Sequence, residues 1–568
     1  MKRKTGLLTT LALTATAGAA LLLAGCHDDN KNTSTDSNTT AQDKLTTTTP
    51  IKHLVVIFPE NQSFDHYFGT YPQSADPTGE PTQSWTAPSN VAYVNNYLKH
   101  PSLLNANPNM TNSLNTSLGY QASYLNPFRI DRAQYNVTSM NHAYLPEQEA
   151  SDNGLMDAFV YYTGKAATSG SAQFGTKAQV LGYFDGNTVT ALWNYAQNYA
   201  MSDNAWTDTF GPSTPGAINV ISGQNNGAVT STGSAIASSA IADGNGSFSV
   251  IGDPDPTGDK CSSTTSATVK MSGQNIGDLL NAAGITWGGF MGGFNLATTN
   301  SNNTTGCARS TVSPNTSSTV TDYIPHHAWF QYYGTTANIN HTRPSSTAMI
   351  GYTETTDSSY GATAINHQYD YNDFVTAVSA GNFPSVSFIK APAFQDGHPG
   401  NSNPLDEQTF ITTAINFIMQ QSDWKNTAII IAYDDSDGWY DHQSPTITTS
   451  SSDATYDAFT AAGSCTSSSA TAGVGLSGKT VNGRCGPGTR TPFLVISPYA
   501  RQNYVDSTQI SQSSIVRFIE DNWLGGKRLG NGSNDAAAGD IRSLFDFTSS
   551  PRTGTYLLNT TTGVRTTS

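Results

Sequence analysis

The feature that most constrains this chain is an uninterrupted apolar run at residues 427–433, long enough for a strand and too short for a helix. Three more strand-like runs, which are mostly apolar but contain residues such as Lys52 and Ser387, are residues 52–58, 385–389 and 492–497. Strands without a polar face must be buried on both sides, which is typical of a mostly parallel sheet covered by helices. Segments with helical spacing of apolar residues are 191–200, 409–419 and 511–522. The alternation predicts an α/β fold with a mostly parallel central sheet.

Long polar stretches interrupt this pattern at residues 231–267, 298–318 and 446–482, and we expect them to be loop insertions. The cysteines outside the N-terminal region are Cys261, Cys307, Cys465 and Cys485. Four cysteines allow three pairings. We favour Cys261–Cys307 and Cys465–Cys485, because each pair closes one polar, loop-like segment. A zinc site is the alternative, but no Cys-x-x-Cys pair supports it.

The first 25 residues have the pattern of an export signal, with a basic start at residues 2–4 before a mostly apolar stretch at residues 7–23. That stretch is short for a membrane span, which needs about 20 apolar residues. Leu23-Ala24-Gly25-Cys26 looks like a bacterial lipobox, although a signal peptide with a chance cysteine is the alternative. We expect an exported lipoprotein, attached to the membrane through Cys26. His27 after the cysteine favours the outer membrane, facing the periplasm or the cell surface.

Composition sets the expected domain boundaries. Residues 26–50 are mostly Asp, Asn, Ser and Thr, which bury too little apolar surface to fold, so we expect a disordered tether. Residues 51–548 form one large domain with insertions, and residues 549–568 a poorly ordered tail. The net charge of −15 at pH 7 disfavours binding to the phosphate backbone of a nucleic acid.

Two acidic motifs follow predicted strands. Glu60 and Asn61 come just after the strand at residues 52–58, where a carboxylate and an amide can both reach one hard cation. Capping of the next helix is the alternative. Asp434 and Asp435 end the apolar run at residues 427–433. Two adjacent carboxylates there repel each other unless something positive lies between them, and a solvated acidic turn is the alternative.

A third motif surrounds Ser213. Pro215 suits the first turn of a helix, which places Ser213 at the helix N-terminus. Backbone N–H groups and the helix dipole favour an anion at that position. A serine there can act as a nucleophile toward a phosphoryl group, whereas a helix-capping serine is the structural alternative.

Together the motifs resemble the bacterial phosphoesterase family of acid phosphatases and phospholipases C, within the alkaline-phosphatase-like superfamily. The matching segments are Glu60-Asn61-Gln62-Ser63-Phe64-Asp65-His66-Tyr67-Phe68-Gly69, Gly211-Pro212-Ser213-x-Pro215, Asp434-Asp435-x-x-Gly438-x-Tyr440-Asp441-His442 and Arg490-x-Pro492. The resemblance spans residues 51–547 and implies a three-layer α/β/α sandwich. It implies that Ser213 is the nucleophile. The implied ligands of one divalent or ferric metal ion are Glu60, Asn61, Asp434, Asp435 and Ser213.

Four histidines match shorter segments of the family, and each can also be a surface or structural residue. The resemblance implies His398 or His142 as the acid that protonates the leaving group, and His326 and His327 as substrate-binding groups. Gly216 occupies the position after the motif proline where many members carry Asn, so no amide contact to phosphate is expected from it.

The resemblance implies hydrolysis of phosphate monoesters, as in an acid phosphatase, through a phosphoserine intermediate. The substrate is expected to be a small phosphoester or a lipid head group, with no nucleic-acid partner. One alternative is a phospholipase C acting on phosphatidylcholine-like diesters, for which Trp329, Tyr332 and Tyr333 could contribute an aromatic cage. An alternative of another class is a surface lipoprotein that binds a ligand without catalysis. The absence of a twin-arginine pair, and the short stretch after Trp523, favour the acid phosphatase.

Overall fold

The computed structural model describes residues 42–75, 79–80, 83–167, 172–354 and 367–566. The predicted export signal, the lipobox and most of the predicted tether lie outside the described residues. None of the described helices combines the length and apolar character that crossing a membrane requires.

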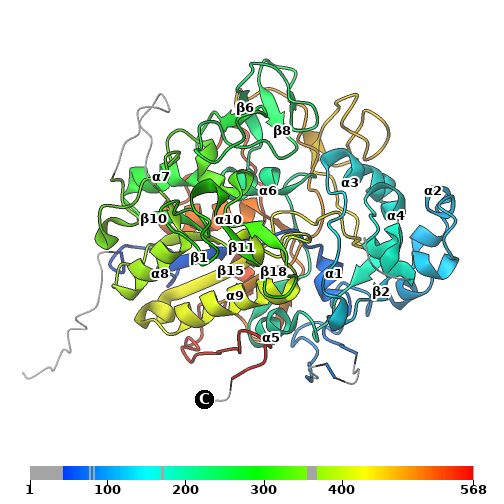
Figure 1. Cartoon of the computed structure of the whole chain (residues 1–568), viewed down its shortest axis with the longest axis horizontal. Coiled ribbons are helices and arrows are strands. Elements are labelled where there is room, and N and C mark those ends of the chain that lie inside the picture. Colours follow the sequence, from blue (N-terminus) through cyan, green and yellow to red (C-terminus); the bar gives the residue numbers. More distant parts are fainter. Residues whose placement is uncertain (1–41, 76–78, 81–82, 168–171, 355–366, 567–568) are drawn as a thin grey trace, which may run out of the picture. The chain divides into compact units, whose positions relative to one another are not determined.

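An eight-stranded sheet forms the centre of the domain (Figure 1). Its strands, in spatial order, are β13 (Gln368–Asp370), β10 (Trp287–Met291), β14 (Val386–Lys390), β1 (His53–Ile57), β15 (Thr427–Ala432), β18 (Phe493–Ile496), β4 (Ala200–Ser202) and β19 (Tyr504–Asp506). All neighbours pair in parallel except β18, which is antiparallel to both β15 and β4. The predicted mostly parallel sheet is therefore confirmed.

Helices cover both faces of this sheet (Figure 1). One face carries α5 (Thr190–Asn198), α8 (Tyr371–Ser379) and α9 (Pro404–Met419), and the other carries α6 (Ser213–Ser222), α7 (Ile276–Ala283) and α10 (Ser513–Trp523). Every residue of β1, β14 and β15 is buried as a result. The apolar runs that predicted these strands have no polar face because neither face of the sheet meets solvent.

The helix predicted at residues 409–419 begins earlier than expected, at Pro404 of α9. Asn403 caps this helix, since its side chain accepts hydrogen bonds from Leu405 N and Asp406 N. Asn followed by Pro at the first helical position is a common start, because proline has no N–H to satisfy. The apolar period alone did not reveal this polar first turn.

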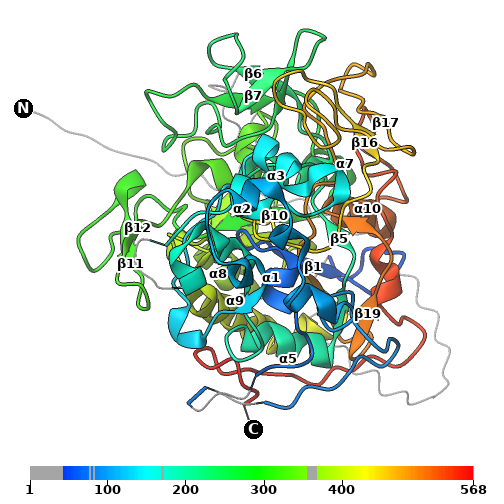
Figure 2. The same ribbon diagram turned by 90° about the vertical axis from the view of Figure 1, so that its right-hand side faces the viewer.

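The insertion predicted at residues 231–267 lies within a small antiparallel sheet of four strands. These are β7 (Ala240–Ala242), β8 (Phe248–Val250), β6 (Asn226–Thr230) and β9 (Val269–Met271). Figure 2 shows this sheet beside the segment that carries β16 (Thr449–Ser450) and β17 (Thr471–Ala472). A hydrogen bond from Asn482 N to Asp243 O, at 3.2 Å, joins the two insertions.

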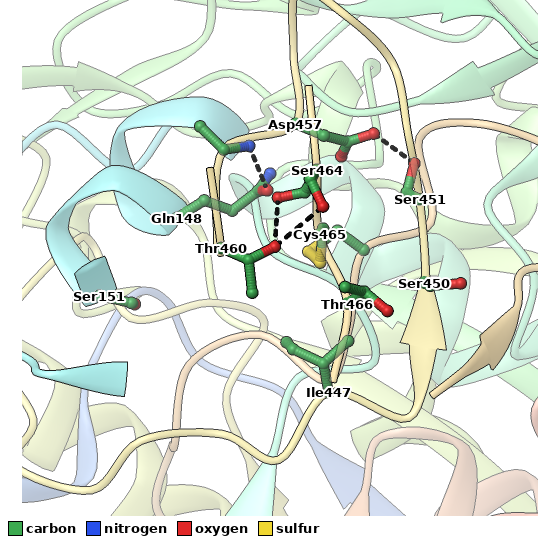
Figure 3. The surroundings of a disulfide bond; sticks show 12 residues. Gln148, Ser151, Ile447, Ser450, Ser451, Asp457, Thr460, Ser464, Cys465 and Thr466 are labelled. Carbon is green, nitrogen blue, oxygen red and sulfur yellow. Dashed lines mark hydrogen bonds between the residues drawn. A yellow bond between two sulfur atoms is a disulfide. The ribbon is translucent and has the colours of Figure 1, made fainter. Parts of the chain in front are cut away.

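Both favoured disulfides are present, Cys261–Cys307 and Cys465–Cys485. The segment around Cys465 packs against α3 (Tyr144–Ser151). The side chain of Gln148, a residue of α3, accepts a hydrogen bond from Ala458 N at 3.0 Å (Figure 3). The Tyr144 hydroxyl accepts another from Cys485 N at 2.9 Å. The disulfide therefore closes the insertion on itself, and these two hydrogen bonds join the insertion to a helix that, as shown below, contributes to the candidate site.

The chain ends depart from the expected tether and tail. Gln42, inside the predicted tether, accepts hydrogen bonds from Thr286 N and Ser385 Oγ, so the domain begins before residue 51. In the predicted tail, Leu558 is buried, and its backbone N–H and carbonyl both bond the side chain of Asn416. A side-chain amide of the domain thus forms the hydrogen bonds that the tail backbone needs when it is buried. The polar composition of the tail alone did not indicate this packing.

Candidate active site

The two acidic motifs meet at one edge of the central sheet. Glu60 and Asn61 follow β1, and Asp434 and Asp435 follow β15, the parallel neighbour of β1. The carboxyl ends of parallel strands lie at the same edge, where ligands gather in folds of this kind. All four side chains are buried. The sequence motifs, more than 370 residues apart, therefore form one cluster.

Ser213 lies beside this cluster, at the first position of α6. Its Oγ is 3.0 Å from Glu60 Oε2, 3.2 Å from Asp435 Oδ2 and 3.5 Å from Asn61 Oδ1. Two backbone N–H groups, of Asn61 and Asp435, donate to Asp434 Oδ1 at 3.1 and 2.9 Å. The structure thus brings together the predicted nucleophile and all four of the other residues predicted as metal ligands.

The backbone of Asn61 is held in the left-handed region, with φ of 55°. Asn tolerates this conformation better than most non-glycine residues, and such strain concentrates at functional sites. The conformation places the Asn61 amide beside Glu60 and Asp434, rather than in the capping role that was the structural alternative.

The oxygen atoms of this cluster fit a divalent cation. Asn61 Oδ1 lies 2.7 Å from Glu60 Oε2 and 3.1 Å from Asp434 Oδ1, and these close oxygen contacts are relieved either by a cation or by an amide turned over to donate to both carboxylates. Asp434 Oδ2 is buried without a hydrogen-bond partner. Burial raises the pKa of Asp434 and Asp435 well above the usual range, and neighbouring carboxylates raise both further. Several buried oxygens that repel one another are the donor set that a hard cation stabilises.

Lys390, the last residue of β14, also belongs to this cluster. Its Nζ contacts Glu60 Oε1 and lies 3.5 Å from Asp434 Oδ2. Burial acts to lower the pKa of Lys390, but the Glu60 and Asp434 carboxylates outweigh it and raise that pKa. Sequence reasoning missed this residue. The available signal was a lysine directly after the apolar run at residues 385–389, at the same end of the sheet as the motifs.

His142 and His398 lie next to the Asn61 amide. Nε2 of His142 is 3.4 Å from Asn61 Nδ2, and the two histidine rings are 5.8 Å apart between centroids. His142 Nδ1 is 3.0 Å from Asp437 Oδ1. Burial alone lowers the pKa of His142, but Asp435 and Asp437 raise it well above its usual range. The carboxylates therefore favour the protonated form of His142, next to the Asn61 amide.

The adjacent histidines His326 and His327 have different surroundings. His327 is buried, and its Nδ1 lies 3.0 Å from Glu60 Oε1, so it orients that carboxylate. Burial lowers the pKa of His327 well below its usual value. His326 is partly exposed, and its Nδ1 lies 3.7 Å from Asp255 Oδ1. Of the pair, His326 is the one whose side chain is accessible from solvent.

The start of α6 offers fewer free amides to a phosphate than the sequence suggested. Thr214 N donates to Asp253 Oδ1, and Gly211 N donates to Glu147 Oε2, both at 2.9 Å. Glu147, on α3, also accepts from Ser436 Oγ at 2.8 Å. Burial raises the pKa of Glu147 to about 7. This carboxyl group links the loop before Ser213 to the loop after Asp435.

Gly216 lets α6 approach the acidic loop closely. A Cβ atom at Gly216 would lie 2.2 Å from the backbone oxygen of Asp434, well inside contact distance. No side chain fits there, which explains structurally why this chain has glycine rather than Asn at that position. The close approach sets the distance between Ser213 and the carboxylates.

A second charged cluster ties the two acidic loops together away from Ser213. Arg490 donates to Asp441 at 3.1 Å and to Asp65 at 3.0 Å. His442 Nδ1 lies 2.6 Å from Asp65 Oδ2. These four family-motif residues therefore hold the loops in place. The aromatic residues considered for a choline cage, Trp329, Tyr332 and Tyr333, are buried core residues and form no open cage.

Comparison with known proteins identifies the family of this chain. Over 174 residues the chain is 30% identical to the non-hemolytic phospholipase C of Pseudomonas aeruginosa, covering 30% of this chain and 24% of the relative. Over 181 residues it is 27% identical to phospholipase C A of Mycobacterium tuberculosis, covering 32% of each protein. The alignments thus span a quarter to a third of these relatives. The model of the Phosphoesterase family matches residues 51–524. As its motifs predicted, the chain belongs to the Phosphoesterase family.

Proposed function

We propose that this protein hydrolyses phosphate monoesters, with Ser213 as the nucleophile. The observation that carries the proposal is the placement of Ser213 Oγ within 3.5 Å of Glu60, Asn61 and Asp435. A hydroxyl group that points into buried carboxylates at a helix N-terminus is positioned for activation. Membership of the Phosphoesterase family supports the same chemistry.

The reaction proceeds in two steps. The Ser213 hydroxyl passes its proton to the carboxylate of Glu60 or Asp435, both of which accept its hydrogen bond. Ser213 Oγ attacks phosphorus in line, the bond from phosphorus to the leaving oxygen breaks, and a phosphoserine forms. The leaving alkoxide takes a proton from His398 or His142, which lie beside Asn61. Water then attacks the phosphoserine and gives a proton to the same histidine. The bond from phosphorus to Ser213 Oγ breaks, the carboxylate returns its proton to Ser213, and inorganic phosphate is released. His326 is positioned to bind the phosphate.

A divalent or ferric cation held by Glu60, Asn61, Asp434, Asp435 and Ser213 would lower the pKa of the Ser213 hydroxyl and neutralise the phosphoryl oxygens. The donor set is made of oxygen atoms, which suits Mg²⁺, Ca²⁺ or Mn²⁺. Around it, Lys390 and His327 orient Glu60, and Glu147 fixes the loop that carries Ser213.

Phospholipase C activity is the second candidate, because the relatives described above carry that name. The same nucleophile and acid would serve, with a diacylglycerol as the leaving alcohol. The burial of Trp329, Tyr332 and Tyr333 removes the predicted support for choline recognition. The monoesterase reaction is therefore the one we favour.

The two candidates are separated by hydrolysis of p-nitrophenyl phosphate and p-nitrophenyl phosphorylcholine, from acidic to alkaline pH, with and without chelator. Faster cleavage of the monoester, lost with chelator, supports the proposal. Preference for the choline diester assigns the protein to phospholipase C. Turnover that survives complete metal removal contradicts the role of the cation.

We also propose that the protein is exported and attached to the outer membrane through a lipid on Cys26. The support is the sequence Leu23-Ala24-Gly25-Cys26 after an apolar stretch. Cells fed a labelled fatty acid should incorporate label into the wild-type chain and not into Cys26→Ser. Equal labelling of the two would reject the anchor.

A further inference from the structure

The Lys390 ammonium is a fixed cation within the carboxylate cluster. Lys390, Glu60 and Asp434 all have fully buried side chains. Lys390 Nζ contacts Glu60 Oε1, lies 3.5 Å from Asp434 Oδ2, and donates to Phe58 O at 3.3 Å. It also lies 5.3 Å from the centroid of the Phe58 ring. These contacts hold the ammonium group at one place beside the two carboxylates.

Glu60 divides its two carboxylate oxygens between two sides of the cluster. Oε2 faces Ser213, whose Oγ is 3.0 Å away, and therefore lies on the side of the reaction. Oε1 faces Lys390 and His327, whose Nδ1 is 3.0 Å away. Asp434 Oδ2 lies on this second side too, near Lys390 and without a hydrogen-bond partner.

The atoms that surround the Lys390 ammonium are themselves suitable metal ligands. They are one oxygen each from Glu60 and Asp434 and the neighbouring imidazole of His327. Carboxylate and imidazole groups bind divalent metal ions when no other cation occupies the position. Lys390 is the group that occupies it here.

The charges of the cluster balance with a single divalent ion. Glu60, Asp434 and Asp435 contribute three negative charges when ionised. One divalent ion and the Lys390 ammonium contribute three positive charges. A second divalent ion would leave two excess positive charges beside the Lys390 ammonium but only one without it, and buried excess charge is costly in a low-dielectric interior.

We propose that Lys390 takes the place of a second metal ion and limits this site to one. The inference rests on the metal-assisted reaction proposed above. Lys390 is a positioning residue, because it acts on the reaction through Glu60 and Asp434 rather than by contact with Ser213. Removal of the ammonium leaves a net negative cluster with free ligand atoms, which should admit a second ion.

The test uses Mn²⁺ alone, without substrate, on the full-length wild-type protein and on Lys390→Met and Lys390→Gln. Equilibrium dialysis followed by elemental analysis gives the ions bound per chain. Wild type should bind about one Mn²⁺ ion and each variant about two, because the ammonium no longer occupies the position between the Glu60 and Asp434 oxygens. The electron paramagnetic resonance spectrum should show coupling between two Mn²⁺ ions in the variants only, which a loosely bound surface ion would not produce.

Lys479→Met is the matched control, since it removes the same charge from an exposed position in the 446–482 insertion. It should keep the wild-type stoichiometry. Lys390→Gln retains a donor for Phe58 O and carries the test if Lys390→Met does not fold. Folded Lys390 variants that bind one ion or none overturn the role of Lys390. Wild type that binds no Mn²⁺ or other divalent ion overturns the metal-assisted reaction itself.

Discussion

Ser213 Oγ lies 3.0 Å from Glu60 Oε2, although 153 positions separate the two residues in the chain. Glu60 follows the central strand β1, and Ser213 opens α6 on one face of the sheet. The contact therefore joins the layer of helices to the edge of the sheet where the carboxylates gather. The stability and chemistry of the site both depend on this junction.

Replacement of Ser213 by Ala should abolish turnover while the fold stays intact, because the nucleophilic oxygen is lost and little packing changes. We expect kcat to fall by about a thousandfold or more, with a melting temperature close to that of wild type. Ser222→Ala, at the other end of α6, removes a hydroxyl that bonds the backbone of Ile218 and Gln224, and it should leave kcat unchanged. Normal activity of purified Ser213→Ala would refute the nucleophile assignment.

Replacement of Asp435 by Asn should lower the metal content of the purified protein, because it removes a charged oxygen 3.2 Å from Ser213 Oγ. Elemental analysis after dialysis measures the effect. Asp131→Asn removes a carboxylate at a side chain that is 61% exposed, and it serves as the control. Equal metal content in wild type and Asp435→Asn would count against the proposed ligands.

Replacement of Gly216 by Ala should impair activity and stability together. The new methyl group would lie 2.2 Å from Asp434 O, so α6 and Ser213 must move away from the acidic loop. We expect a loss of about 1–3 kcal/mol in the free energy of unfolding, as for other overpacked cores. Gly554→Ala has nothing within 4 Å of the new Cβ and should change neither property. Denaturant unfolding and kcat are measured for both variants, and a Gly216→Ala protein as stable and active as Gly554→Ala would contradict the prediction.

Removal of the Cys465–Cys485 disulfide, with Ser at both positions, should lower the free energy of unfolding by about 3 kcal/mol, because the bond closes a loop with a sequence separation of 20 residues. The hydrogen bonds of this segment to Gln148 and Tyr144 stay available, so activity at low temperature should persist. Denaturant titrations of the wild type and the double variant measure the difference. No change in stability would show that the α3 contacts alone hold the insertion.

Glu407, in the first turn of α9, should make stability fall as pH rises. Burial raises its pKa from 4.5 to about 8, although the hydroxyls of Tyr433 and Tyr67 donate to it. The unfolded chain loses this proton near pH 4.5 and the folded protein near pH 8. The stabilisation is therefore complete below 4.5 and is lost between these values. Glutamine does not titrate. The melting temperature of Glu407→Gln should therefore vary less than that of wild type between about pH 5 and 8, the range between the pKa of Glu407 in the unfolded chain and its pKa in the folded protein. An equal pH dependence of the melting temperature in wild type and Glu407→Gln would contradict the titration of Glu407.

The strands and the acidic motifs were open to prediction from sequence because their signals are local. β1 and β15 have no polar residue over most of their length, since both faces of the sheet are covered. Glu60 and Asp434 directly follow these strands, so a parallel pairing was enough to bring them together. The Cys465–Cys485 pairing followed from the same kind of local pattern.

Other features had no local signal. The burial of Leu558 depends on Asn416, 142 positions away, so the polar composition of the C-terminal segment was misleading. The aromatic residues after His327 looked suitable for a binding cage. Whether Trp329 faces solvent or core is decided by the elements packed around it, and it is fully buried.

The sequence by itself determined the class of fold, the family motifs and the residue types able to bind a cation and attack phosphorus. The tertiary structure decided which of these groups share a side of the cluster. Lys390 reaches Glu60 only because β14 pairs with β1 in a register that aligns Ile389 with Ile57. His326 and His327 lie in one short helical turn, whose path directs the His327 side chain to Glu60 and leaves the His326 side chain partly exposed. Such relations depend on distances of a few ångströms between distant segments, which only packing of the whole domain sets.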